Sequence, residues 1–429
     1  MRWQFMNRES LLALMCRTVE AGVLTLALAA VILTMSPAEQ GLFIAFLSFS
    51  GLLQLFDFGL SYAALQTSAH LVASGERTRL PPFGVMVSRL ALAQGVSGVI
   101  LVGIAGYFLI GTGAAGWGGD WFGPWVFFVV FAGSAQMFMP LVAKYEGSVS
   151  VTAAWQLRLV QESVGGCALI VCLAQGLVLW SLPAWAGARL LVVTLWFFTR
   201  PAIKEISPVT VRGFTLEAWR REIWPFQWKL GVSGITAFAI LRSMTLIILA
   251  VRGPEDAGRF GLSLAIMNML LAVTTVWPYS QARRLGALLA AGKMAEMTSL
   301  RRQITIASSF LVGLFAMIFC SFQYYAMQRG WSFAFRMGDL STTILLLLTA
   351  LVQQVIACLA VLLRVERRDP LLPVSILGGF LVIAAVSITS RTDDLSHVAL
   401  AYLLVNLIGI PFVWFALRRF MRRHSGVNA

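Results

Sequence analysis

Twelve long apolar segments constrain this chain more than any other feature of its sequence. A helix needs about 20 apolar residues to cross the hydrocarbon core of a bilayer, and it satisfies its backbone hydrogen bonds within one segment. Because 59% of the residues are hydrophobic and only 12% are charged, the sequence predicts an all-α polytopic membrane protein with about 12 transmembrane helices. The segments lie at residues 11–34, 41–66, 84–110, 124–143, 159–179, 182–199, 230–251, 258–280, 303–325, 339–363, 370–388 and 397–417.

A short motif occurs once in each half of the chain. Residues 37–43 read Pro-Ala-Glu-Gln-Gly-Leu-Phe, and residues 254–260 read Pro-Glu-Asp-Ala-Gly-Arg-Phe, each time between two apolar segments. A weaker similarity relates residues 71–75 to residues 288–292. The repeat predicts two homologous six-helix lobes, which enter the membrane in the same direction because each has an even number of spans. Duplicated hydrophobic halves of this kind are a recurring plan of secondary transporters.

Lysine and arginine are distributed very unevenly between the two sides of the predicted membrane domain. Most of the 33 basic residues lie on one set of alternate connections, and the other set holds only Arg252, Arg259, Arg329, Arg336 and Arg391. Short cytoplasmic loops retain positive charge, so we expect both termini to be cytoplasmic. The longest basic connection, residues 204–228, is predicted to join an N-terminal lobe of residues 1–203 to a C-terminal lobe of residues 229–429.

This distribution also accounts for the formal net charge of +14. The basic residues lie where membrane insertion would place them, beside the anionic headgroups of membrane lipids. We therefore expect membrane lipids as partners and no nucleic acid.

Charged residues inside apolar segments are functional candidates, because a charge in hydrocarbon is costly. Arg17 and Glu20 lie three residues apart in the first segment, near the bilayer midplane, and they can neutralise each other or line a cavity. Arg242 lies at a similar depth in the seventh segment, the repeat counterpart of the first. An arginine fork binds phosphate bidentately and keeps its charge, so Arg17 and Arg242 facing one cleft would suit a diphosphate.

Three further expectations concern polar residues. Asp57 in the second segment is expected to pair with Arg17 or Arg89. Glu20 and Asp57 are also the candidates for coupling transport to protons or Na⁺, since carboxylates form such relays in transporters. Asn268 is expected either to join helices or to meet a hydroxyl-rich substrate. The cysteines and histidines lack the spacing of metal ligands, so no metal or other cofactor is predicted.

The whole chain resembles the polysaccharide flippases of the multidrug/oligosaccharidyl-lipid/polysaccharide (MOP) exporter superfamily. The resemblance implies two six-helix lobes around a cationic cavity, which carry a polyprenyl-diphosphate-linked oligosaccharide across a bacterial inner membrane by alternating access. It also implies that Arg17 and Arg242 bind the substrate and that polysaccharide biosynthesis enzymes are partners. The motifs that carry it are residues 36–41 (Ser-Pro-Ala-Glu-Gln-Gly), 56–62 (Phe-Asp-Phe-Gly-Leu-Ser-Tyr), 145–147 (Tyr-Glu-Gly) and 253–258 (Gly-Pro-Glu-Asp-Ala-Gly).

Other functions stay open at this point. An ion-coupled multidrug or small-molecule antiporter of the same superfamily would share the two-lobe plan but would favour carboxylates over arginines. A major-facilitator transporter also has six plus six spans, but its basic signature between spans 2 and 3 is missing from residues 73–80. A membrane glycosyltransferase or polymerase usually needs a catalytic outer loop, and the outer connections here are short. The sequence therefore predicts a transporter and not an enzyme.

Overall fold

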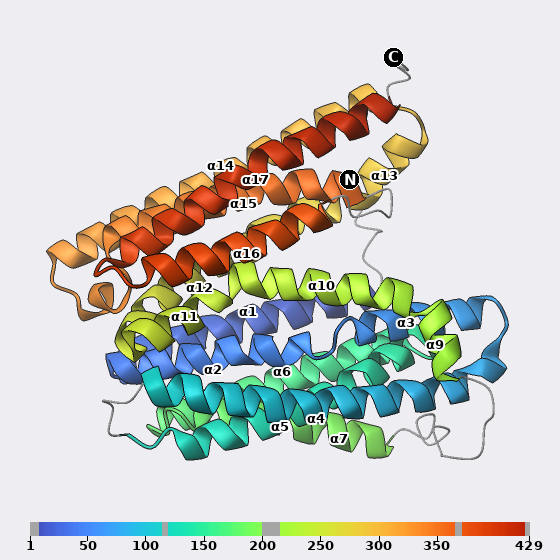
Figure 1. The fold of residues 1–429 in the computed structure, drawn as a ribbon, viewed down its shortest axis with the longest axis horizontal. Helices are drawn as coiled ribbons and strands as arrows, with labels where there is room; N and C mark the ends of the chain where they lie inside the picture. The colour runs from blue at the N-terminus through green and yellow to red at the C-terminus, as the bar shows by residue number, and fades with distance from the viewer. Residues whose placement is uncertain (1–7, 114–118, 200–214, 365–370, 425–429) are drawn as a thin grey trace. The chain divides into compact units, whose positions relative to one another are not determined.

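The computed structural model describes residues 8–113, 119–199, 215–364 and 371–424, and the regular structure in these ranges is entirely helical (Figure 1). Up to residue 199 the described helices are α1 (Arg8–Thr34), α2 (Pro37–Leu55), α3 (Leu60–Ala73), η1 (Arg77–Arg79), α4 (Leu80–Gly113), α5 (Phe122–Ser148), α6 (Val151–Ala174) and α7 (Ser181–Thr199). From residue 215 onward they are α9 (Leu216–Glu222), α10 (Trp224–Leu241), α11 (Ser243–Arg252), α12 (Pro254–Ser280), α13 (Ala282–Ala290), α14 (Met294–Gln328), η2 (Ser332–Arg336), α15 (Leu340–Arg364), α16 (Leu372–Thr389) and α17 (Leu395–His424).

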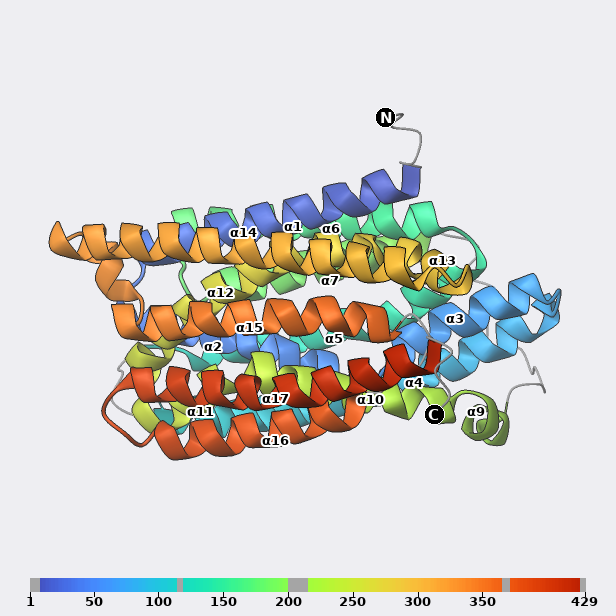
Figure 2. The ribbon, with the colours of Figure 1, turned by 90° about the horizontal axis from the view of Figure 1, so that it is seen from above.

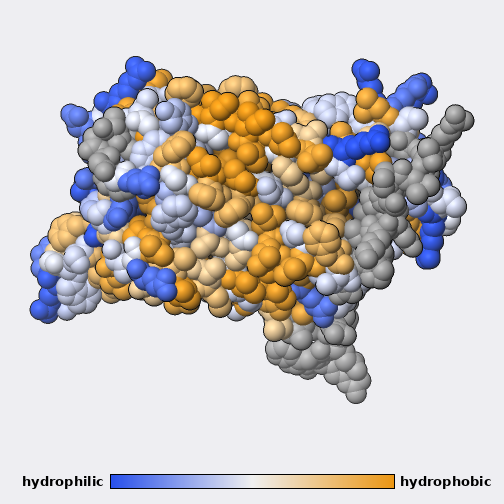
Figure 3. All heavy atoms as spheres, turned by 90° about the horizontal axis from the view of Figure 1, so that it is seen from below, coloured by the Kyte–Doolittle hydropathy of each residue, from blue (hydrophilic) through white to orange (hydrophobic). Residues whose placement is uncertain are grey.

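Eleven of the described helical segments are long and apolar enough to cross a membrane, and the bent pair of α10 and α11 makes twelve if it is counted as one span. The prediction of an all-α protein with about 12 spans is therefore confirmed. One face of the molecule, on which α4 and α7 lie, shows a broad hydrophobic surface between two hydrophilic ends (Figure 3). Helices α4 and α7 carry exposed apolar side chains such as Leu92, Ile100 and Leu191, as expected of helices that face lipid.

Two predicted spans are not continuous helices. The second segment was predicted as one span at residues 41–66, but α2 ends at Leu55 and α3 begins at Leu60. The helix is interrupted there because Phe58 and Gly59 both have positive φ angles, of 44° and 77°, which a right-handed α-helix does not accommodate. The seventh span bends by 49° between α10 and α11, at Arg242.

The chain divides into two compact units, Met1–Phe238 and Ala239–Ala429, which we call the N-unit and the C-unit. The N-unit includes α9 and most of α10, residues that the sequence assigned to the connector and the second lobe. Packing explains the placement of α9, since Trp219 and Ile223 are buried in a cluster with residues of α3 and α4 such as Leu60 and Phe83.

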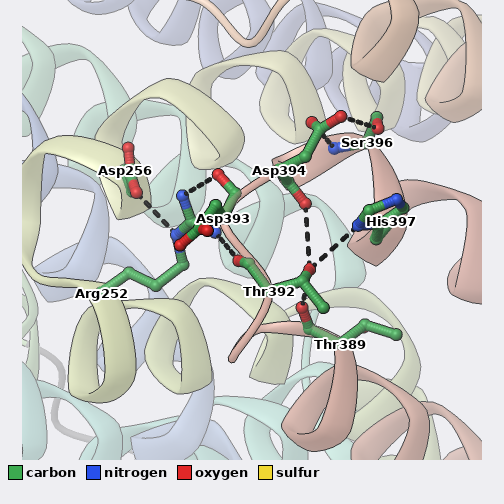
Figure 4. A network of polar contacts seen from close by, with 8 residues as sticks. All are labelled: Arg252, Asp256, Thr389, Thr392, Asp393, Asp394, Ser396 and His397. Carbon is green, nitrogen blue, oxygen red and sulfur yellow. Dashed lines mark hydrogen bonds and ion pairs between the residues drawn. The ribbon is translucent and has the colours of Figure 1, made fainter.

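The repeated motif marks the start of a helix in both halves. In the first copy, Ser36 and Glu39 form a capping box: the Glu39 backbone N–H donates to Ser36 Oγ (3.3 Å) and the Ser36 N–H to Glu39 Oε2 (2.7 Å). In the second copy, Gly253 has no side chain to cap α12, and the equivalent carboxylate, Asp256, pairs with Arg252 instead (2.6 Å). The guanidinium of Arg252 also donates to the backbone carbonyls of Thr392 and Asp393, between α16 and α17 (Figure 4).

The Tyr-Glu-Gly motif at residues 145–147 is a packing device at the end of α5. A Cβ atom on Gly147 would lie only 2.4 Å from the Leu65 carbonyl oxygen, so glycine allows α5 and α3 to approach closely. Glu146 pairs with Arg158 on α6 at 2.5 Å, and the ring of Tyr145 lies 4.9 Å from that of Trp196 on α7. Three consecutive residues thus fasten α5 to three neighbouring helices.

Candidate functional site

The face of α1 opposite its packing partner carries the candidate site. Helix α1 lies beside α6 in both views of the ribbon (Figures 1 and 2). Gly166 of α6 makes room for Val23, because a Cβ atom on this glycine would be 2.3 Å from the valine side chain. The exposed side of α1 carries polar or small residues among large apolar ones such as Leu24 and Leu26, and no atom lies within 4 Å of a Cβ built on Gly22. Its exposed residues include Arg17, Thr18, Glu20, Gly22 and Thr25.

Arg17 and Glu20 form an ion pair on this face. Arg17 Nη1 donates to Glu20 Oε2 at 2.7 Å, and the two side chains remain 70% and 48% exposed. Charged groups in the middle of a membrane span face a protein interior or a water-filled space, because exposure to lipid is too costly. The structure thus brings together the two residues that the sequence selected in the first span, and both side chains are exposed.

A second ion pair joins α6 to α7. Glu162 and Arg189 are 2.8 Å apart and mostly buried, and the Arg189 guanidinium stacks over the Trp185 ring at 4.5 Å. Glu162 also interacts electrostatically with Glu20 and Arg17, so the four charged groups form one system. Sequence analysis did not select this second pair. The available signal was the presence of opposite charges in two adjacent spans.

Asp57 contacts Ser61 and not the expected arginine, and its role in ion coupling stays a prediction. The carboxylate accepts hydrogen bonds from the Ser61 backbone N–H (3.1 and 3.2 Å) and from Ser61 Oγ (2.7 Å), which stabilises the start of α3. Among the described residues it forms no ion pair with Arg17 or Arg89, so that prediction was wrong. The reason is that the break at Phe58 and Gly59 creates a new helix start, whose free N–H groups attract the carboxylate.

Arg242 and Asn268 both belong to the C-unit. Arg242 is exposed and lies at the bend of the seventh span, where its φ of −131° interrupts the helix directly before α11. Asn268 is half-buried on α12. Because Arg17 belongs to the N-unit, a shared site of Arg17 with Arg242 or Asn268 stays a prediction.

Other amides of the C-unit join helices. Gln354 of α15 is fully buried and accepts a hydrogen bond from Thr274 Oγ1 of α12 at 2.9 Å. Its neighbour Gln353 donates to Tyr402 Oη (2.6 Å) and to Asn406 Oδ1 (3.1 Å), both on α17. These bonds link α15 to two other spans, as polar residues between membrane helices commonly do. In the described part of the chain, no three His, Cys, Asp or Glu side chains are grouped so as to hold a metal ion.

The structure of this protein is similar to known structures, although its sequence matches no known family. No family model and no curated relative matches the sequence. The structure is similar to that of an inward-facing multidrug resistance MATE family transporter of the MOP superfamily, with a TM-score of 0.73 and 13% identity over 97% of this chain and 100% of the other. It is also similar to the lipid II flippase MurJ, with a TM-score of 0.65 and 13% identity over 96% of this chain and 87% of that protein.

A third similar structure is a MOP superfamily transporter from Pyrococcus furiosus, described as having a binding pocket of reverse polarity. Its TM-score is 0.61, with 14% identity over 98% of this chain and 96% of the other. These proteins are transporters and flippases, and the similarity in each case extends over nearly the whole of this chain. The protein therefore has the fold of the MOP superfamily of membrane transporters.

Proposed function

We propose that this protein is a flippase that moves a polyprenyl-diphosphate-linked oligosaccharide from the cytoplasmic to the outer leaflet of a bacterial inner membrane. The observation that carries the proposal is the exposed Arg17–Glu20 ion pair within the first span. A membrane helix keeps such charges exposed only beside water, and a hydrophilic headgroup needs a water-filled path of this kind. The MOP fold includes the lipid II flippase MurJ, so it is compatible with lipid-linked cargo.

In this proposal Arg17 is the phosphate ligand of the N-unit and Arg242 that of the C-unit. Arg17 donates from Nη1 to Glu20, and its side chain is 70% exposed. A guanidinium binds phosphate through charge-assisted hydrogen bonds of about 1.5–3 kcal/mol each. Glu20 stands beside the arginine as the candidate coupling group, because a carboxylate that takes up a proton would release its partner for an anion.

A small-molecule exporter is the second candidate, and the carboxylate of the same pair favours it. Glu20 would attract a cationic substrate, and the MATE family transporter with the same fold is a multidrug resistance protein. The two functions predict opposite roles for the charges. A flippase depends on Arg17, whereas a cation exporter depends on Glu20.

The test is to measure polyprenyl-linked saccharides in cells depleted of the protein and resupplied with variants. We expect a complete oligosaccharide-lipid to accumulate in the cytoplasmic leaflet on depletion, detected by mass spectrometry and a leaflet-accessibility assay. Arg17→Gln should lower flipping about 10- to 100-fold, the loss of one or two charge-assisted bonds. Arg242→Gln should act in the same direction.

The matched control is Arg77→Gln, which removes an exposed arginine at the end of a span and should leave flipping unchanged. All variants are compared at equal amounts in the membrane, so that failed insertion is not mistaken for lost transport. Unchanged lipid intermediates on depletion, together with new sensitivity to cationic compounds, would establish the exporter and refute the flippase.

A further inference from the structure

A surface outside the candidate site combines exposed aromatic and basic side chains. It is formed by α9 and the first turns of α10, at the end of the spans where the sequence concentrates its positive charge. Trp224, Phe226 and Trp228 are 44%, 39% and 39% exposed, and Leu216 is more exposed still. We call this the connector surface, and its remaining members are Arg220, Arg221 and Lys229, all exposed.

The orientation of α9 is fixed by its opposite face. Trp219 and Ile223 lie one helical turn apart and are buried against α3 and α4, where the Trp219 ring stacks 6.3 Å from that of Phe83. Glu222 forms an ion pair with Arg79 at 2.9 Å, which fastens the end of α9 to the turn before α4. Since one face is held in this way, Arg220 and Arg221 point away from the protein.

The charges on the connector surface are not balanced locally. Arg221 pairs with Glu217 at 2.6 Å, and the other nearby carboxylate, Glu222, is engaged by Arg79. Within the described residues, Arg220 and Lys229 have no ion-pair partner. The surface is therefore cationic, and it complements an anion.

We propose that the connector surface binds the headgroups of anionic phospholipids. Tryptophan prefers the boundary between headgroups and hydrocarbon, where Trp224 and Trp228, one turn apart on α10, would lie together. Arginine and lysine extend their apolar stems along such a boundary and place the charge among the phosphates. Each cation near an anionic membrane surface raises the association constant for that surface about fivefold.

The proposed lipid contact lies where the basic connection between the two halves meets the seventh span. Helix α9 ends the basic connection between the two halves, and α10 begins the span that bends at Arg242. Bound lipid would hold the end of the connection at the membrane surface. The inference concerns this surface alone and does not depend on the proposed function.

The test uses the full-length protein and lipid binding rather than transport. Native mass spectrometry of the protein titrated with dioleoylphosphatidylglycerol or dioleoylphosphatidylcholine gives the preference for the anionic lipid. We expect the triple variant Arg220→Gln, Arg221→Gln, Lys229→Gln to lose that preference by at least about tenfold. The matched control is the triple variant Arg284→Gln, Lys293→Gln, Arg302→Gln, which removes the same charge from an exposed segment without aromatic residues. This control should retain the preference for the anionic lipid.

Equal losses in the two triple variants would show only a general attraction of charge and would overturn the proposal. A second variant, Trp224→Leu with Trp228→Leu, keeps the apolar surface but removes the indole rings. It should weaken the binding of both lipids, and it should change the preference for the anionic lipid less than the triple charge variant does. Unchanged lipid binding in this variant, with loss of binding to a free oligosaccharide added as probe, would instead identify a saccharide site and refute the lipid surface.

Discussion

Substitution of Gly147 by alanine tests how the Tyr-Glu-Gly motif positions α5. The new Cβ atom would lie 2.4 Å from the Leu65 carbonyl oxygen and 2.5 Å from Ser68 Oγ, whereas an ordinary contact is 3.4 Å or more. The carbonyl belongs to the α3 backbone and cannot rotate away, so the two helices must separate by about 1 Å. Overpacking of this kind costs roughly 1–3 kcal/mol. Alanine regains part of this as helix propensity, up to about 1 kcal/mol.

We therefore expect Gly147→Ala to lower the free energy of unfolding by about 1–2 kcal/mol. The assay is reversible denaturation in mixed micelles, with thermal stability in detergent as a second measurement. Gly313→Ala is the control, because no atom lies within 4 Å of its new Cβ and the substitution should be neutral or stabilising. If both alanine variants were as stable as the parent protein, Gly147 would not be needed for close packing of α3 and α5.

Three further predictions use the same denaturation assay. Glu146→Gln should destabilise by about 2 kcal/mol, because a neutral amide replaces the carboxylate that accepts the charge-assisted hydrogen bond of Arg158. Gln354→Leu should cost about 1 kcal/mol by removing a buried bond between membrane helices. Asp394→Ala should cost about 1 kcal/mol through loss of the cap at the start of α17. Hydrogen bonds from Ser396 lower the pKa of the Asp394 carboxyl, so this cap should contribute fully above about pH 4 and be lost as the pH falls further.

The spans could be predicted from sequence because the bilayer allows few alternatives. Long apolar segments must form helices there, and each of the twelve predicted segments overlaps a candidate span of the structure when the bent pair α10–α11 is counted as one. The breaks at residues 56–59 and at Arg242 could not be predicted in this way. They depend on tertiary packing: Phe58 adopts its positive φ with its ring against Gly231 of α10, where a Cβ atom would be 2.5 Å away, and near Trp224.

The candidate site was predicted in part, for a related reason. Arg17 and Glu20 lie three residues apart in one helix, so their pairing follows from helical geometry alone. Glu162 and Arg189 are on different helices, and their pairing depends on how α6 packs against α7. Asp57 was assigned an arginine partner because the helix start beside it was not foreseen. Local geometry was predictable, whereas contacts between helices required the structure.

The repeat and the in-span charges provide different kinds of information. Both copies of the repeated motif place proline in the first turn of a helix and a carboxylate two residues later, and they differ in the capping residue and in the partner of that carboxylate. Ser36 closes a local cap, whereas Arg252 extends the contact to the connection between α16 and α17. The motif therefore specifies where a span begins, and it would do so for any cargo. The in-span ion pairs of the N-unit have no such role at a helix start, so the substrate is better sought through Arg17 and Glu20 than through the motifs that reveal the fold.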